Sequence, residues 1–408
     1  MTEVTTQPDQ LTKRVRVVVS LMAAMTLAGL ANGLIYAFVP IRLDTLGFEP
    51  WVAGSMIAVL AIGGLAGCFL SGPTVHWMGR PRAFLAGLLL LLSSHAVVAL
   101  TNDPVLWAAS RLLYGTAMTL MFVVSQSWIN AVVSNQARGK IQATYNTLFI
   151  VGLGVGGYGI GFVDLSGSMA PQISIVITLL AMLPLLLPGL PSPPLESAGR
   201  IRLLRAWQIS PIGFVGMFCV GGLTLLIQGF APIYGQASGF SPAEIGRMML
   251  FMQLGIIGVQ LAAGAISDQI DRRWVLIASG LAVVFFAGIT SQVTGLNFFL
   301  LVAAFGLWAG ATETVFAVAS AQAYDHAEPS EYVMLSATLI TLWSLGAAVI
   351  PAGASFLTDL IGVTAYMYVA GGIGLLFTLF VIIRMFMRDP PEPSSISEPP
   401  EYTDAPLP

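Results

Sequence analysis

Long apolar runs follow one another along most of this chain, each about 20 residues long and separated by short polar breaks. A run of that length is what a helix needs to cross a hydrocarbon layer of about 30 Å. One very large soluble core is excluded, because only 9% of the 408 residues are charged. Ordinary soluble domains carry about 25% charged residues. The mean hydropathy of +0.84 agrees with a membrane protein.

Twelve helices are predicted from these runs, and the fold class is all-α integral membrane. The predicted spans are about 16–40, 51–71, 82–101, 104–132, 141–163, 171–189, 211–235, 242–267, 274–292, 297–321, 332–357 and 363–387.

Lys and Arg are shared unequally between the two sides that these spans define. The side with both termini holds 14 of the 17 basic residues, whereas the opposite loops hold only Arg42. Cytoplasmic loops of membrane proteins carry the excess of Lys and Arg, so both termini are predicted to be cytoplasmic.

The segment 38–82 recurs without a gap 192 residues further along the chain. Matched residues include Phe38 with Phe230, Gly47 with Gly239, Gly63 with Gly255 and Arg80 with Arg272. An ungapped match across two loops indicates an internal duplication. We therefore expect two six-helix bundles related by pseudo-twofold symmetry, as in a parallel repeat.

The expected domain organisation follows from the spans and the breaks between them. A cytoplasmic N-terminal tail covers 1–15, the bundles cover 16–189 and 211–387, a cytoplasmic linker covers 190–210, and a disordered cytoplasmic tail covers 388–408. The linker is either a short interfacial helix or a basic connection. Cys68 and Cys219 lie inside apolar runs and are interpreted as core residues, with no disulfide and no metal site.

A motif between the second and third spans repeats in the second half. It reads Gly72-Pro-Thr-Val-His76-Trp-Met-Gly79-Arg80-Pro-Arg82, and its copy runs from Gly264 through Asp268 to Arg272. The order resembles the signature of the major facilitator superfamily: a Gly, three residues, an Asp, two residues, then Gly-Arg, one residue and a basic residue. The twelve-span topology is also similar to that family.

The resemblance implies that this motif is a conformational latch, in which a carboxylate caps a helix end and pairs with Arg. That role carries over to the motif residues of both copies: Gly72, Gly79, Arg80, Arg82, Gly264, Asp268 and Arg272. His76 stands where the family has Asp, and a neutral imidazole does not make the same charge-assisted bond. Two hypotheses stay open for His76, a pH-sensitive latch and a tolerated loop substitution.

Two charged residues fall inside predicted spans, where charge is costly and usually functional. Arg111, followed by Gly115, resembles the family's fourth-helix pattern, whose Arg is implicated in proton coupling; the alternative is an Arg that extends to the membrane surface. Glu313 is a candidate to carry a proton or contact the substrate, and the alternative is a role in helix packing. The two differ in depth by about 13 Å at 1.5 Å per residue, so no direct salt bridge is expected.

Several uncharged polar residues are candidates to line a central cavity. Asn32 and Tyr36 lie one turn apart, and Tyr36 has Gln228 as its repeat counterpart. Further candidates are amides and aromatic residues: Gln126, Asn130, Tyr145, Asn146, Gln253, Gln260 and Trp343. Polar side chains of this kind form hydrogen bonds between helices nearly as often as they line a cavity. The glycines from Gly152 to Gly161 indicate close packing of the fifth span, and Glu244 is interpreted as part of a helix cap.

The predicted function is secondary transport of a small organic solute by alternating access, coupled to protons. The alternatives are a drug or lipid efflux pump, which the 17 Met residues keep open, and a non-transporting assembly factor of the same fold. Gly157 stands where drug/proton antiporters of the family carry Pro, which disfavours an antiporter without excluding it. No catalytic or phosphate-binding motif is found. We expect no enzyme activity, no cofactor, no nucleic-acid partner, and a monomer in the bilayer of a bacterial inner membrane.

Overall fold

The fold is described from a computed structural model that covers residues 8–133, 135–186, 190, 201–292, 298–328 and 331–387. The predicted tail 388–408 lies outside these residues. Within them the chain is helical and forms no strand. The N-terminal half consists of α1 (Pro8–Thr45), α2 (Pro50–Leu100), α3 (Pro104–Val132), α4 (Asn135–Tyr158), η1 (Gly159–Phe162), α5 (Met169–Met182) and η2 (Leu183–Leu185).

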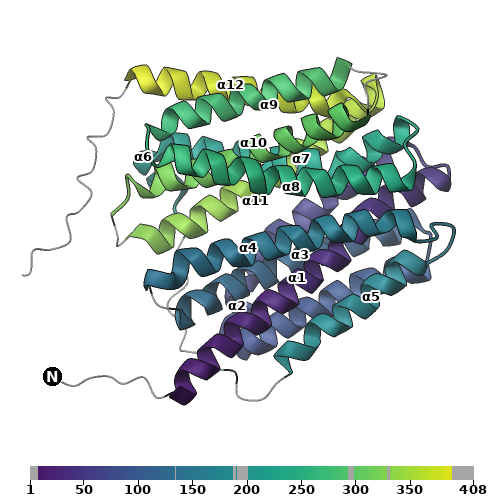
Figure 1. The fold of residues 1–408 in the computed structure, drawn as a ribbon, viewed down its shortest axis with the longest axis horizontal. Coiled ribbons are helices and arrows are strands. Elements are labelled where there is room, and N and C mark those ends of the chain that lie inside the picture. Colours follow the sequence, from purple (N-terminus) through teal and green to yellow (C-terminus); the bar gives the residue numbers. More distant parts are fainter. Residues whose placement is uncertain are drawn as a thin grey trace, which may run out of the picture.

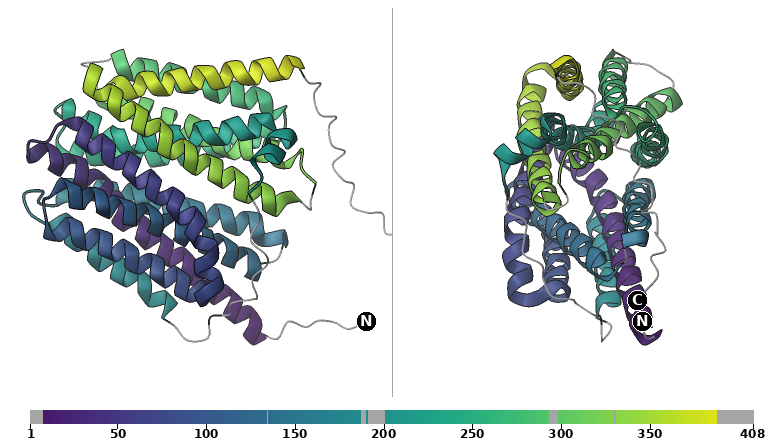
Figure 2. Two further views of the ribbon diagram at one scale, coloured as in Figure 1. Left: turned by 180° about the vertical axis from the view of Figure 1, so that it is seen from behind. Right: turned by 90° about the vertical axis from the view of Figure 1, so that its left-hand side faces the viewer.

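The C-terminal half begins after a short helix, α6 (Leu203–Ile209). It consists of α7 (Pro211–Ala237), α8 (Pro242–Ser267), α9 (Arg272–Gln292), α10 (Phe298–Tyr324), α11 (Tyr332–Ile361) and α12 (Ala365–Met387). The two halves lie side by side with their helices roughly along one direction (Figures 1 and 2). The beginning of α1 and the end of α12 lie at the same end of the molecule, here called the terminal end; the opposite end is the far end.

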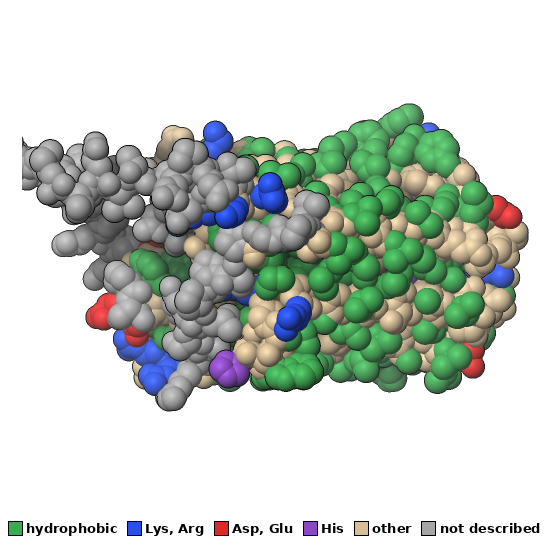
Figure 3. All heavy atoms as spheres, turned by 90° about the horizontal axis from the view of Figure 1, so that it is seen from below, with side chains coloured by type: hydrophobic (Ala, Val, Ile, Leu, Met, Phe, Trp, Pro, Cys, Tyr) green, Lys and Arg blue, Asp and Glu red, His purple; other side chains and the backbone are tan. Residues whose placement is uncertain are grey.

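Helix length and hydropathy agree with a chain that crosses a membrane many times. In the described residues, nine helices are long and apolar enough to span, and the 50-residue stretch Trp51–Leu100 is long enough to cross twice. The remaining predicted spans correspond to α4 and to the shorter apolar segment Met169–Leu185. The surface agrees, because hydrophobic side chains cover the middle of one face and charged side chains gather toward its two ends (Figure 3).

One predicted connection is wrong in detail. The motif from Gly72 to Arg82 was expected to be a loop, yet the helix continues through it and breaks only at Gly79, with φ of 77° and ψ of 164°. This left-handed backbone suits Gly, which has no Cβ to clash. Part of the predicted N-terminal tail 1–15 is helical, since α1 begins at Pro8.

Glycines bring the central helices of each half into backbone contact. A Cβ on Gly29 of α1 would overlap the carbonyl oxygen of Phe149 in α4, and a Cβ on Gly152 would overlap that of Thr26. In the second half, Gly221 of α7 meets the carbonyl of Trp343 in α11, and Gly346 meets that of Phe218. Gly221 and Phe218 follow Gly29 and Thr26 by 192 residues, so the packing repeats as well as the sequence.

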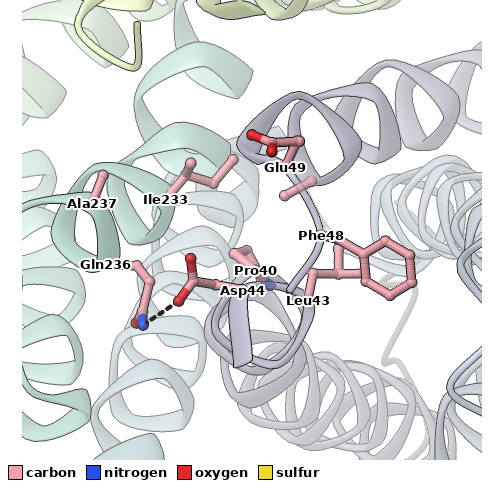
Figure 4. Close-up of a pocket in the computed structure, with 9 residues that line it drawn as sticks. Pro40, Leu43, Asp44, Phe48, Glu49, Ile233, Gln236 and Ala237 are labelled. Atoms are coloured by element: carbon pink, nitrogen blue, oxygen red, sulfur yellow. Dashed lines mark hydrogen bonds between the residues drawn. The ribbon is translucent and has the colours of Figure 1, made fainter. Parts of the chain in front are cut away.

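The two halves are joined at the far end and near the middle of the molecule. At the far end, the Gln236 side chain donates to Asp44 at 2.9 Å, beside a shallow pocket that Glu49 and Phe48 also line (Figure 4). Asp44 and Gln236 occupy equivalent repeat positions, 192 residues apart.

The halves also meet where α2 contacts α11 and where α4 and η1 contact α8. Ser355 Oγ of α11 donates to the Trp51 carbonyl of α2 at 3.2 Å, and nearer the middle Cys68 Sγ lies 3.2 Å from Ser344 Oγ. The predicted glycine-rich surface of the fifth span is the other contact. Gly154 and Gly157 face Gln253 and Met249 of α8, and Gly161 faces Ala243.

The linker region contains the helix α6, docked against the C-terminal half. The Trp207 ring meets Phe214 edge-on, with ring centroids 5.5 Å apart, and Arg205 Nε bonds Glu331 at 2.7 Å. This hydrogen bond lowers the pKa of the Glu331 carboxyl. Of the two alternatives for the linker, the structure therefore favours a helix over part of it.

We expect Gly221→Ala to lower the thermal unfolding midpoint of the purified protein, because its methyl group would overlap the Trp343 carbonyl. Overpacking of this kind costs about 1–3 kcal/mol. Gly372→Ala is the matched control, since nothing lies within 4 Å of a Cβ added there on α12. Equal midpoints for the two variants would contradict the backbone contact.

Candidate functional site

Arg111 is buried inside the N-terminal half, on α3, with 4% of its surface exposed. Its guanidinium carbon lies 5.0 Å from the centre of the Tyr114 ring, a cation–π distance. Nη2 is 3.5 Å from the hydroxyls of Ser94 and Ser110, and Nε has no hydrogen-bond partner among the described residues. Arg111 therefore does not extend to the membrane surface, which was the alternative considered from the sequence.

Asn32 and Tyr36 of α1 lie opposite this part of α3. The Tyr36 ring meets Tyr114 edge-on, with centroids 5.9 Å apart, and Asn32 Nδ2 donates to Met118 Sδ at 2.8 Å. Asn32 is fully buried, and no residue that the structure describes bonds its Oδ1. Tyr36 thus joins the aromatic group around Arg111, and the side chains of Asn32, Tyr36, Arg111 and Tyr114 are here called the α1–α3 polar layer.

His95 belongs to the same bundle and was not singled out from the sequence. It is fully buried on α2, and its Nδ1 lies 3.2 Å from Thr178 Oγ1 of α5. The Thr178 hydroxyl donates to the Ser174 carbonyl at 2.7 Å, so toward His95 its oxygen acts as acceptor. Nδ1 must then be the donor, and Nε2, which has no partner, is the free ring nitrogen. Its position in an apolar run was the signal that could have identified it.

Glu313 of α10 is half-buried in the C-terminal half. Its Oε1 accepts a hydrogen bond of 2.6 Å from Thr224 Oγ1 of α7, and Gln260 of α8 donates to its backbone carbonyl at 3.4 Å. Among the ion pairs of the described residues, none includes Glu313 or Arg111. Thr224 is the repeat counterpart of Asn32, 192 residues on, a relation that could have singled it out.

The remaining candidates are scattered rather than gathered at one point. Tyr145 is buried, and its hydroxyl bonds Ser125 at 2.6 Å. Gln253 is 3% exposed and lies at the contact between α4 and α8, with Oε1 unpartnered. The others are half-buried or exposed: Gln126, Gln228 and Trp343 are half-buried, and Asn130 and Asn146 are exposed.

Among the predicted latch residues of the N-terminal half, Arg80 contacts a serine of α3. Arg80 is buried, and its Nε donates to Ser127 Oγ of α3 at 3.1 Å. His76 and Arg82 are exposed, and a Cβ on Gly72 would meet nothing within 4 Å.

The predicted latch residues of the C-terminal half belong to an ion-pair cluster at the terminal end. Arg272 Nε pairs with Asp325 at the end of α10, at 2.7 Å, and its Nη1 lies 3.4 Å from Asp268. The expected carboxylate, Asp268, is therefore the more distant of the two partners of Arg272 and is largely exposed. The closer partner, Asp325, was not predicted from the sequence. A Cβ on Gly264 would also meet open space. Glu244 completes a capping box with Ser241, as predicted.

Comparison with known proteins agrees with this architecture. The model of the Major Facilitator Superfamily matches residues 21–257 and 212–407. An uncharacterized MFS-type transporter of Yersinia pseudotuberculosis is 26% identical over 384 residues, covering 92% of this chain and 96% of the relative. The uncharacterized MFS-type transporter YcaD of Escherichia coli is 24% identical, covering 82% of this chain and 87% of the relative.

Solved structures share the fold at low sequence identity. The nucleoside transporter NupG superposes with a TM-score of 0.74 at 13% identity, over 91% of this chain and 100% of that one. A D-xylose–proton symporter gives 0.68 at 15%, over 89% and 97%. The human organic anion transporter MFSD10 gives 0.62 at 18%, over 90% and 99%. This multi-pass membrane chain therefore belongs to the major facilitator superfamily, whose members are transporters and not enzymes.

Proposed function

We propose that the protein is a secondary transporter of a small organic solute, driven by protons, in a bacterial inner membrane. Bacterial relatives along nearly the whole chain support this location. The three solved relatives are transporters of a nucleoside, of D-xylose with a proton, and of organic anions, so the shared fold does not select the solute.

The surroundings of Glu313 carry the proposal of proton coupling. It is the acid on a membrane-spanning helix for which the described residues provide a hydroxyl partner, Thr224, and no cation. A carboxyl group in such a place binds and releases a proton more readily than it holds a fixed charge. Arg111 contributes to coupling as a constant charge, because a guanidinium keeps its proton in proteins.

The contacts at the far end support alternating access. Gln236 with Asp44, Ser355 with Trp51, and Gly161 with Ala243 all join the two halves there. Since the terminal end is predicted to be cytoplasmic, we assign this conformation as closed to the outside. Transport then requires these contacts to separate as the halves rotate against each other.

The buried polar groups also favour a transporter over a non-transporting assembly factor. Asn32, Arg111 and Gln253 each place a polar atom without a partner in the interior. An interior used for packing alone favours apolar side chains there, because unpartnered buried polar groups are destabilising. Drug or lipid efflux remains the alternative that a solute screen decides.

We expect Glu313→Gln to abolish stimulation of uptake by a pH gradient, because an amide does not take up a proton. The solute comes from a thermal-shift screen, and uptake is measured in proteoliposomes with and without the gradient. Exchange of labelled for unlabelled solute at equal pH should persist. Glu328→Gln, which removes an exposed carboxylate between α10 and α11, is the control. Gradient-driven uptake that survives in Glu313→Gln would remove Glu313 from the mechanism.

A disulfide across the far end should stop transport. A Cβ on Gly161 would lie 3.1 Å from the Ala243 Cβ, close to the 3.5–4.5 Å typical of disulfides. We expect Gly161→Cys with Ala243→Cys, in a Cys68→Ala, Cys219→Ala background, to lose uptake on oxidation and regain it on reduction.

A matched pair inside one half provides the control for that experiment. Val283→Cys with Gly374→Cys joins α9 and α12, where a Cβ on Gly374 would lie 3.3 Å from the Val283 Cβ. This disulfide should leave uptake unchanged, because no contact between the halves is involved. Uptake that continues with the first pair fully oxidised would mean that the far end stays closed throughout.

A further inference from the structure

In the part of the chain that the structure describes, Arg111 forms no ion pair with an acidic side chain, and this points to the solute. Its contacts are two hydroxyls at 3.5 Å, near the limit of hydrogen bonding, and the face of Tyr114. Burying a charge is strongly unfavourable unless it is paired and fully hydrogen-bonded. A guanidinium cannot relieve that cost by losing its proton. The group is therefore incomplete without an anion.

Four acids at the far end of the N-terminal half are hydrogen-bonded to other groups or exposed. At the far end, Asp103 caps α3 by accepting from the Val105 amide at 2.8 Å, and Asp164 accepts from Ser166 at 2.8 and 2.9 Å. Asp44 bonds Gln236, and Glu49 is exposed beside the pocket. In the described part of the chain, none of these four forms an ion pair with Arg111.

The atoms that remain free around Arg111 suit a carboxylate. Nε is unpartnered and Nη2 is only loosely held, so the guanidinium can still donate along one edge. A guanidinium edge donates two parallel hydrogen bonds to a carboxylate, which makes it a selective partner for that group. The phenol of Tyr36, half-buried on α1, belongs to the same aromatic group and provides a further donor beside it.

The depth of Arg111 suits a transported ligand. It lies seven residues after the start of α3 at the far end, about 10 Å along the helix. The far end is closed in this conformation, and Arg111 is correspondingly covered.

We propose that the solute is an organic anion and that Arg111 binds its carboxylate. This proposal rests on the proposed transport function and names its substrate class. Separation of α1 and α7 at the Asp44–Gln236 contact exposes the α1–α3 polar layer to the outside, where the anion enters. Glu313, in the other half, carries the proton, so the anion and the proton have separate sites.

Equilibrium binding in detergent tests the proposal without requiring transport. The thermal unfolding midpoint is measured with sodium acetate, sodium benzoate, the neutral acetamide and benzamide, and sodium chloride, the ionic solutions at equal sodium concentration. We expect the carboxylates to raise the midpoint and the amides to leave it unchanged, because a ligand that binds only the folded protein stabilises it. Equal shifts by acids and amides, or no shift by either acid, would overturn the proposal. A shift by chloride as large as that by the carboxylates would also overturn it, in favour of a resident inorganic anion.

Substitutions test whether carboxylate binding depends on Arg111 rather than on another basic residue. Arg111→Gln should weaken carboxylate binding by about tenfold or more, since it removes a charge-assisted pair. Arg247→Gln is the control, because Arg247 is an exposed Arg on α8 that contacts the Ala243 carbonyl and the Phe298 ring. If Arg111→Gln fails to fold, Arg111→Lys keeps the charge but not the planar fork, and a reduced carboxylate shift is again expected. Unchanged binding in either folded variant would overturn the assignment.

The two proposals fail in distinguishable ways. Carboxylate binding through Arg111 with no uptake into proteoliposomes would refute transport and leave the anion site standing. Uptake of a neutral solute, or anion uptake that survives Arg111→Gln, would refute the anion site and leave transport standing.

Discussion

Close backbone contact between helices is the interaction on which the rest of this structure depends. In a bilayer, apolar side chains gain little by leaving lipid for protein, so helix association depends on tight packing. Glycines supply that packing between α1 and α4 and, by duplication, between α7 and α11. The polar side chains of Asn32 and Thr224 occupy equivalent places on α1 and α7, so the same contacts hold both candidate sites in position.

The two halves contain candidate charged groups of opposite sign, Arg111 in the first half and Glu313 in the second. Arg111 lies among hydroxyls and aromatic rings in the first half, and Glu313 lies against Thr224 in the second. Among the described residues, neither Arg111 nor Glu313 forms an ion pair with an opposite charge. Unpaired buried charges destabilise a fold. Their presence is consistent with the proposal that Arg111 binds an anion and Glu313 binds a proton during transport.

The duplication preserved the backbone more faithfully than the polar side chains. Equivalent positions carry Tyr36 and Gln228, and His76 and Asp268. At the predicted latch, the exposed His76 and Asp268 also differ in charge type, and only Asp268 is an acid that lies near an Arg of its own motif. Helix packing constrains both copies alike, because each must cross the same hydrocarbon layer. A single central site needs each polar group only once, so the polar side chains of the two copies were free to diverge.

The sequence by itself determined the helical class, the number of spans and the duplication, because these follow from run length and from residues compared along one chain. It also located Arg111 and Glu313, since a charge inside an apolar run is visible without coordinates. The tertiary structure decided which groups meet: Tyr36 with Tyr114, Thr224 with Glu313, Arg272 with Asp325. It alone showed that Gly79 breaks a continuous helix and that Arg111 has no acidic partner in the described chain. The physical reason is that contacts between helices depend on their rotation and depth, which the period of a single helix leaves undetermined.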